Sequence, residues 1–181
     1  MAKVCVHLAT GFEELEAITM LDVLRRADIA VLMVSMTKEM NVTSVHGLTV
    51  LADILFEDVD YENVDMIVLP GGMPGSTNLA AHEGLKQRIS QFANQGKYLA
   101  AICAAPIVYG QMGLLKGKAA ICYPGFEKNL DGAEIATERV VQTQNFITSK
   151  GPGTSLEFSF KLVEILKDKD TAEKIRTAML A

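Results

Sequence analysis

Residues 98–106 read Y-L-A-A-I-C-A-A-P, a short apolar run that leads directly into small residues. The run predicts a buried strand, and the residues that follow, A-A-P-I-V-Y-G-Q-M (104–112), predict a helix. Ala101 and Ala105 stand two positions on either side of Cys103. This small-x-nucleophile-x-small form is typical of a nucleophile elbow, a sharp strand-to-helix turn on which large neighbours would clash. The sequence therefore predicts that Cys103 lies on such a turn.

A cysteine on this turn faces the positive end of the following helix, which favours the thiolate and predicts a lowered pKa. The alternative is that Cys103 is only a small buried hydrophobic residue at the end of a strand. We favour a functional thiol because the elbow pattern and the strand end coincide. For Cys5, inside the first apolar run, and for Cys122 we expect structural roles in the core.

Strand-like and helix-like segments alternate along the rest of the chain. The expected strands are 3–10, 30–36, 65–70, 98–103, 118–123 and strands within 139–149, with a hairpin in 41–52 that turns near His46 and Gly47. The expected helices are 13–27, most of 77–94 up to a cap near Gly96, 155–167 with a Thr154/Glu157 capping box, and a last helix with the same signature at Asp170/Glu173. This alternation predicts an α/β protein whose mostly parallel sheet carries helices on both faces.

Ligands bind such sheets beyond the carboxyl ends of the strands. Four segments follow apolar strands at that edge: 11–16, 71–76, 103–106 and 151–154. We expect them to converge around Cys103. Gly71 and Gly72 would let the backbone approach a ligand and offer N–H groups to an oxyanion, although turn geometry alone also explains such a pair.

A base for the thiol is not evident among the histidines. His7, His46 and His82 are all distant from Cys103 in the sequence, and residue 104 is alanine. The alternative is an acidic residue at the start of the first helix. Glu13 and Glu14 fit simple compensation of the helix dipole. Glu16 follows Leu15 one turn deeper, where a buried carboxyl would be partly protonated and could hydrogen-bond a thiolate.

Composition excludes several classes of protein. The 181 residues carry 17 basic and 22 acidic side chains, a net charge of −5, which argues against nucleic-acid binding. Apolar residues make up 49% and charged residues 22%, which excludes disorder and fits one domain over residues 1–181. No apolar run is long enough to span a membrane, and residues 1–9 lack the layout of a secretory signal.

The three cysteines are an odd number without any C-x-x-C pair. This favours free thiols in a reducing cytoplasm over disulfides or a zinc site. No metal site and no organic cofactor is evident, and neither glycine-rich loop fits a Walker-type phosphate loop.

Four motifs together resemble the ThiJ/PfpI superfamily: E-E-L-E-A (13–17), L-P-G-G (69–72), A-A-I-C-A-A-P (100–106) and G-P-G-T-S (151–155). Their order and spacing are most similar to its parkinsonism-associated deglycase branch and to bacterial ThiJ-like proteins. The resemblance implies a flavodoxin-like α/β sandwich, usually a homodimer, with Arg26 at the dimer interface. It also implies an oxidation-sensitive nucleophile at Cys103, a protonated carboxyl at Glu16, and N–H groups supplied by Gly72 and Ala104.

Three positions depart from the family pattern. Tyr123 precedes Pro124 where several members carry histidine, His46 stands where some carry an anion-binding arginine, and Ala104 replaces the histidine of related intracellular proteases, which argues against peptidase activity. The resemblance implies a cofactor-independent glyoxalase or deglycase, of the hydrolase or lyase class, that acts on small aldehydes or glycated substrates. The alternative from another class is a non-enzymatic redox-sensing stress protein or chaperone that uses the same thiol.

Overall fold

A seven-stranded sheet forms the centre of the molecule, in the order β10-β11-β7-β6-β1-β2-β5. The computed structural model describes residues 2–181. All neighbours in the sheet are parallel except β10 and β11, which form an antiparallel hairpin at one edge. The strands of this sheet are β1 (Lys3–Leu8), β2 (Ala30–Ser35), β5 (Ile54–Leu55), β6 (Met66–Leu69), β7 (Tyr98–Ile102), β10 (Val140–Thr143) and β11 (Phe146–Ser149).

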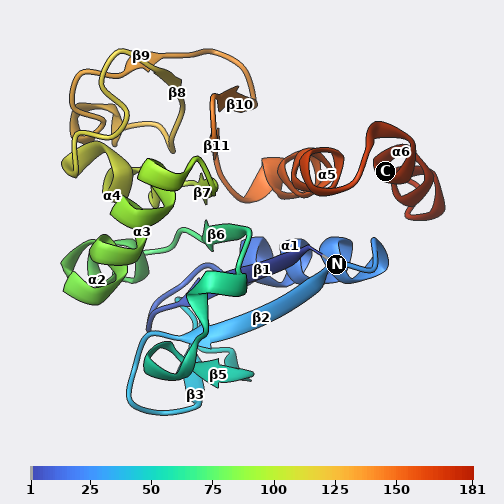
Figure 1. Ribbon diagram of the computed structural model, residues 1–181, viewed down its shortest axis with the longest axis horizontal. Coiled ribbons are helices and arrows are strands. Elements are labelled where there is room, and N and C mark those ends of the chain that lie inside the picture. The colour runs from blue at the N-terminus through green and yellow to red at the C-terminus, as the bar shows by residue number, and fades with distance from the viewer. Residues whose placement is uncertain (1) are drawn as a thin grey trace.

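Helices cover both faces of this sheet, as the sequence predicted (Figure 1). On one face lie α1 (Glu14–Arg26), α5 (Ser155–Leu166) and α6 (Lys169–Ala178), and on the other lie α2 (Gly75–Ala81), α3 (Glu83–Gln95) and α4 (Pro106–Gln111). A separate apolar cluster fills the space between the sheet and each helical layer. The strands are buried on both faces for this reason, and they therefore have continuous apolar sequences.

Within the described residues 2–181, two small sheets and four 3₁₀ turns complete the fold. The expected hairpin in 41–52 is present as β3 (Asn41–Thr43) and β4 (Thr49–Leu51), which pair antiparallel. The expected strand over 118–123 is only β8 (Ala119–Ala120), which pairs with β9 (Glu134–Ile135) outside the main sheet. The turns are η1 (Phe56–Asp58), η2 (Tyr61–Asn63), η3 (Glu127–Asn129) and η4 (Pro152–Thr154).

The helix expected over most of 77–94 is instead two helices, α2 and α3. The backbone of His82 is extended, and its Nδ1 accepts a hydrogen bond from the N–H of Leu85 at 3.1 Å. His82 therefore caps the start of α3 and breaks the helical run. The expected end is confirmed, because Gly96 has a left-handed backbone with φ of 70°.

Both predicted capping boxes are wrong. Thr154 makes no side-chain cap at the start of α5, and Glu157 bonds to Arg139 instead. At the start of α6 the capping side chain is Asp168, whose Oδ1 accepts from the N–H of Thr171 at 2.7 Å. In the described residues 2–181, no helix has the length and apolar character that crossing a membrane requires.

Candidate active site around Cys103

Cys103 follows directly after β7 and has a left-handed backbone, with φ of 63°. Its N–H donates to the carbonyl of Ser149 on the neighbouring strand at 3.0 Å, which holds the turn against the sheet. Ala101 and Ala105 on either side are fully buried, so larger side chains would have no room there. The residue thus has the strained geometry of a nucleophile elbow. The residue is 9% exposed and lines a cavity.

The carboxyl of Glu16 lies beside Cys103 and is completely buried. Its Oε2 accepts a hydrogen bond from the N–H of Gly71 at 2.7 Å, whereas its Oε1 is buried without a hydrogen-bond partner. Burial raises the pKa of Glu16 to about 7, and the nearby charge of Glu13 acts in the same direction. The N–H of Gly71 and the contact with Cys103 oppose this rise. A partly protonated carboxyl at Glu16 is therefore consistent with its surroundings.

The pKa of the Cys103 thiol is not lowered, contrary to the prediction from the helix position. Burial and, to a smaller extent, the charge of an ionised Glu16 together raise this pKa to about 12, while the N–H groups of Gly72 and Ala104 act to lower it. Helix α4 begins only at Pro106 and has six residues, so its dipole is a weak influence on the thiol. Two adjacent buried anions repel each other, so Cys103 and Glu16 titrate as a coupled pair. Ionisation of either group therefore disfavours ionisation of the other.

The two glycines after β6 have different roles. The N–H of Gly71 is taken by Glu16, so it is not aimed at a substrate oxyanion as we had expected. A Cβ at position 71 would lie 2.5 Å from Cys103 Cβ and 2.9 Å from Glu16 Oε2, so only glycine lets this loop pass between the two side chains. Gly72 and Ala104 instead direct N–H groups at the Cys103 sulfur.

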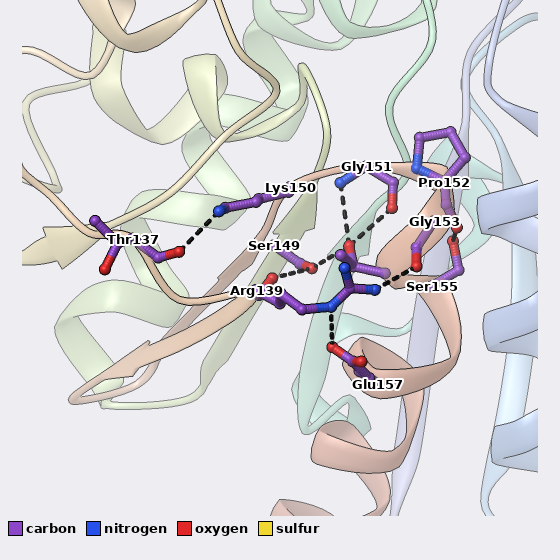
Figure 2. A network of polar contacts seen from close by, with 10 residues as sticks. Thr137, Arg139, Ser149, Lys150, Gly151, Pro152, Gly153, Ser155 and Glu157 are labelled. Carbon is purple, nitrogen blue, oxygen red and sulfur yellow. Dashed lines mark hydrogen bonds and ion pairs between the residues drawn. The ribbon is translucent and has the colours of Figure 1, made fainter. Parts of the chain in front are cut away.

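The loop that follows β11 closes the site from another side. Gly151 lies where a Cβ would be 3.9 Å from Cys103 Sγ, and Pro152 lines the cavity. Figure 2 shows the polar network that holds this loop: Arg139 donates to Gly153 O and to Glu157 Oε2, both at 2.7 Å. Thr154 Oγ1 bonds to both backbone groups of Gly151. Arg139 could not be predicted as part of the site, because no local motif indicates an arginine that bonds to a loop 14 residues ahead.

The cavity beside Cys103 has a volume of about 250 Å³. It is lined by Glu13, Gly72, Met73, Cys103, Ala104, Tyr123, Phe126 and Pro152. The predicted segments 11–16, 71–76, 103–106 and 151–154 therefore all contribute residues to one place. Segment 122–127 is a fifth contributor, which the pattern of strand ends does not predict. It supplies Tyr123, a position that departs from the family pattern, and Phe126, which no sequence motif indicates.

The remaining cysteines and histidines lie elsewhere. Cys5 and Cys122 are buried in the apolar cluster on the α2–α4 face, in agreement with structural roles, and burial raises the pKa of each to about 12. Nε2 of His7 pairs with the Tyr61 hydroxyl at 2.8 Å, and His46 Nδ1 pairs with Glu14 at 2.9 Å. His82 caps α3 as described, so no histidine is paired with Cys103.

One group of side chains within residues 2–181 brings three possible metal ligands together: Glu13, Glu14 and His46. His46 is well exposed and already pairs with Glu14. Exposed acidic groups beside a histidine form such ion pairs without a metal, and we assign none here.

The chain resembles known proteins in both sequence and fold. The model of the DJ-1/PfpI family matches residues 2–165. The chain is 39% identical over 175 residues to protein DJ-1 homolog B of Arabidopsis thaliana, covering 96% of this chain but only 40% of that longer protein. It is 32% identical over 164 residues to a glutathione-independent glyoxalase of Caenorhabditis elegans, covering 90% of this chain and 87% of the relative. The solved structure of oxidized Toxoplasma gondii DJ-1 superposes with a TM-score of 0.95 at 37% identity, covering 99% of this chain and 98% of that one.

Proposed function

Since this chain belongs to the DJ-1/PfpI family, we propose that it is a cysteine-dependent enzyme of the glyoxalase or deglycase type, acting on small dicarbonyls or glycation adducts. The observation that carries this proposal is the buried pair of Cys103 and Glu16. Glu16 has a raised pKa of about 7 and a buried Oε1 without a hydrogen-bond partner, next to a nucleophile that lines a cavity. A carboxyl with a pKa close to the working pH is suited to take up and return a proton. The glyoxalase among the relatives supports the same reaction class.

The first step is addition of the Cys103 thiolate to the aldehyde carbon of a 2-oxoaldehyde. The carbon–sulfur bond forms while the electron pair of the carbonyl moves to its oxygen, which becomes the hydroxyl of a hemithioacetal. The proton that leaves the thiol passes to Glu16 and then to this oxygen, so no charge accumulates in the buried site. The N–H groups of Gly72 and Ala104, which act to lower the pKa of the Cys103 thiol, would stabilise the developing oxyanion.

The second step is an internal redox rearrangement. Glu16 Oε1 removes the proton from the former aldehyde carbon and returns it to the adjacent carbonyl carbon, while the hydroxyl proton of the hemithioacetal passes to the oxygen on that second carbon. The first carbon is thereby oxidised and the second is reduced. The product is a thioester of a 2-hydroxy acid. Water cleaves the thioester, which releases the acid and restores the thiol. The sum is one dicarbonyl plus one water to one hydroxy acid, without an external oxidant or reductant.

Turnover of methylglyoxal by the purified protein tests the proposal. We expect Cys103→Ser to abolish lactate formation with an unchanged fold, because a serine hydroxyl is far harder to ionise than a thiol. Cys122→Ser is the matched control, since that thiol is buried in the core away from the cavity, and it should retain activity if it folds. A wild-type rate no higher than that of a free thiol would contradict the enzyme and favour the redox-sensing alternative.

We also propose that the protein is a homodimer that uses an apolar face next to the site. Leu15, Ile18 and Leu156 are large exposed hydrophobic side chains on α1 and α5. Together with Pro152 and Met179 they line a groove of about 660 Å³. Contiguous exposed apolar surface of this kind is typical of protein interfaces. Because Pro152 also lines the Cys103 cavity, a second copy seated here would lie close to the substrate.

A reducing cytoplasm is the compartment that we propose for this activity. All three cysteines, Cys5, Cys103 and Cys122, are free thiols, and the nucleophile must remain reduced.

A further inference from the structure

An aromatic pair forms one wall of the Cys103 cavity. Tyr123 and Phe126 both line it, with ring centroids 6.4 Å apart and ring planes at 74°. The side chain of Tyr123 is 47% exposed. A buried aromatic pair is ordinary core packing, but an exposed ring at the mouth of a nucleophile's cavity is free to contact a ligand.

The position of this wall is fixed by the backbone beside the nucleophile. The N–H of Tyr123 donates to the carbonyl of Cys103 at 2.8 Å, and the N–H of Phe126 donates to the carbonyl of Tyr123 at 3.2 Å. The Tyr123 ring lies against Gly151, where a Cβ would be only 3.1 Å from Cδ2 and 3.9 Å from Cys103 Sγ. The ring is therefore held close to the sulfur, because position 151 has no side chain.

The charge of the cavity is negative. Glu13 is among its lining residues, and the lining includes no lysine or arginine. The charge of Glu13 acts on groups within the site, since it contributes to the raised pKa of Glu16. His46 lies 3.9 Å from Glu13, but it is exposed and pairs with Glu14 at 2.9 Å. An anionic ligand would be repelled here and would find no cationic partner on the cavity wall.

We propose that this cavity selects neutral 2-oxoaldehydes that carry an aromatic or bulky apolar substituent and rejects carbonyl compounds that carry a carboxylate or phosphate. Tyr123 and Phe126 are the specificity-determining residues that pack on the substituent, and Glu13 excludes anions. The proposal rests on the proposed function, because the aldehyde is the group that Cys103 attacks. The volume of about 250 Å³ is below the range of about 300–1,000 Å³ typical of sites for drug-sized ligands, which limits the substituent to about one ring.

The first experiment compares kcat/KM for phenylglyoxal and methylglyoxal. We expect the wild-type protein to prefer phenylglyoxal, and Tyr123→Ala and Phe126→Ala each to lower the ratio of the two values by about threefold to tenfold. Tyr123→Phe keeps the ring and should keep the ratio. An unchanged ratio in Tyr123→Ala, or a loss in Tyr123→Phe as large as in Tyr123→Ala, would overturn the assignment to the ring.

The second experiment measures alkylation of Cys103 without turnover, by peptide mass spectrometry. The rates with neutral iodoacetamide and anionic iodoacetate are each divided by the rate of a small free thiol with the same reagent. We expect wild-type Cys103 to react at least about tenfold more slowly with iodoacetate on this scale, and Glu13→Gln to reduce the difference. Equal normalised rates in the wild-type protein would overturn the rejection of anions.

The same assay separates this proposal from the proposed function. On the same normalised scale, phenacyl bromide should alkylate Cys103 faster than bromoacetone does, and Tyr123→Ala should remove this difference in rate. If these preferences hold while no dicarbonyl is turned over, the selectivity stands and the proposed reaction fails. If dicarbonyls are turned over without any preference for aromatic reagents, the reaction stands and the selectivity is wrong.

Discussion

Replacement of Glu16 by glutamine should change how the stability of the protein depends on pH. Glutamine has the same shape, and its carbonyl oxygen can still accept the 2.7 Å hydrogen bond from the N–H of Gly71. It cannot ionise, however. The variant therefore removes the titration of Glu16 and leaves the packing of α1 against the loop in place.

The magnitude follows from the difference between the folded and unfolded pKa of Glu16, about 7 against 4.5. Between these values the folded protein keeps a proton that the unfolded chain has released. The free energy of unfolding therefore falls as the pH rises through this window, by about 1.4 kcal/mol per pH unit and by about 3 kcal/mol in all. Below pH 4.5 this penalty is absent, and above pH 7 it is complete. This decrease in the free energy of unfolding depends only on the number of protons bound in the folded and unfolded states. It is therefore the same whether the proton of the pair lies on Glu16 or on Cys103.

Urea denaturation of both proteins at several pH values between 4 and 8 measures this effect. We expect the stability difference, Glu16→Gln minus wild type, to increase by about 3 kcal/mol from pH 4.5 to pH 7.5. Glu13→Gln is the matched control: it removes a less buried carboxyl from the same segment and should keep most of the wild-type fall. Parallel profiles for wild type and Glu16→Gln would refute a protonated carboxyl at the site.

Three further outcomes test other parts of the site. Limited hydrogen peroxide should oxidise Cys103 before the two cysteines that are 1% exposed or less, because oxidation follows exposure; peptide mass spectrometry showing either of the others first would contradict this. Gly71→Ala should lower the free energy of unfolding by about 1–3 kcal/mol and slow turnover, since its Cβ would lie 2.5 Å from Cys103 Cβ; Gly153→Ala, whose Cβ meets nothing within 4 Å, is the control in denaturant titrations. Ile18→Asp should shift the protein toward a monomer in sedimentation experiments, whereas a monomeric wild type would end the dimer proposal.

The sheet and most helices could be predicted because their signals are local. Continuous apolar runs such as β1 and β6 indicate strands buried on both faces, and small residues around Cys103 indicate the elbow. The break between α2 and α3 could not be predicted in this way. It depends on which group the imidazole of His82 bonds, and the periodicity of apolar residues is insensitive to that choice.

The site was predicted in outline but not in its electrostatics. The convergence of four segments follows from parallel strand ends, and Glu16 was expected from its depth in the first turn of α1. The pKa of Cys103 depends instead on the distance and burial of Glu16, which only the packed structure gives. The hydrogen bonds from the Gly71 N–H to Glu16 and from Arg139 to Gly153 also join residues far apart in the sequence, so local sequence patterns do not predict them.

The left-handed backbone of Cys103 sets thermal stability against the presence of a thiol at this position. A non-glycine residue with φ of 63° is less stable by about 1 kcal/mol or more than glycine would be in the same conformation. In a population of chains selected only for heat tolerance, position 103 should drift toward glycine. Selection that demands the reaction should hold cysteine there, so the residue found at this position after laboratory evolution reports whether the thiol is still needed.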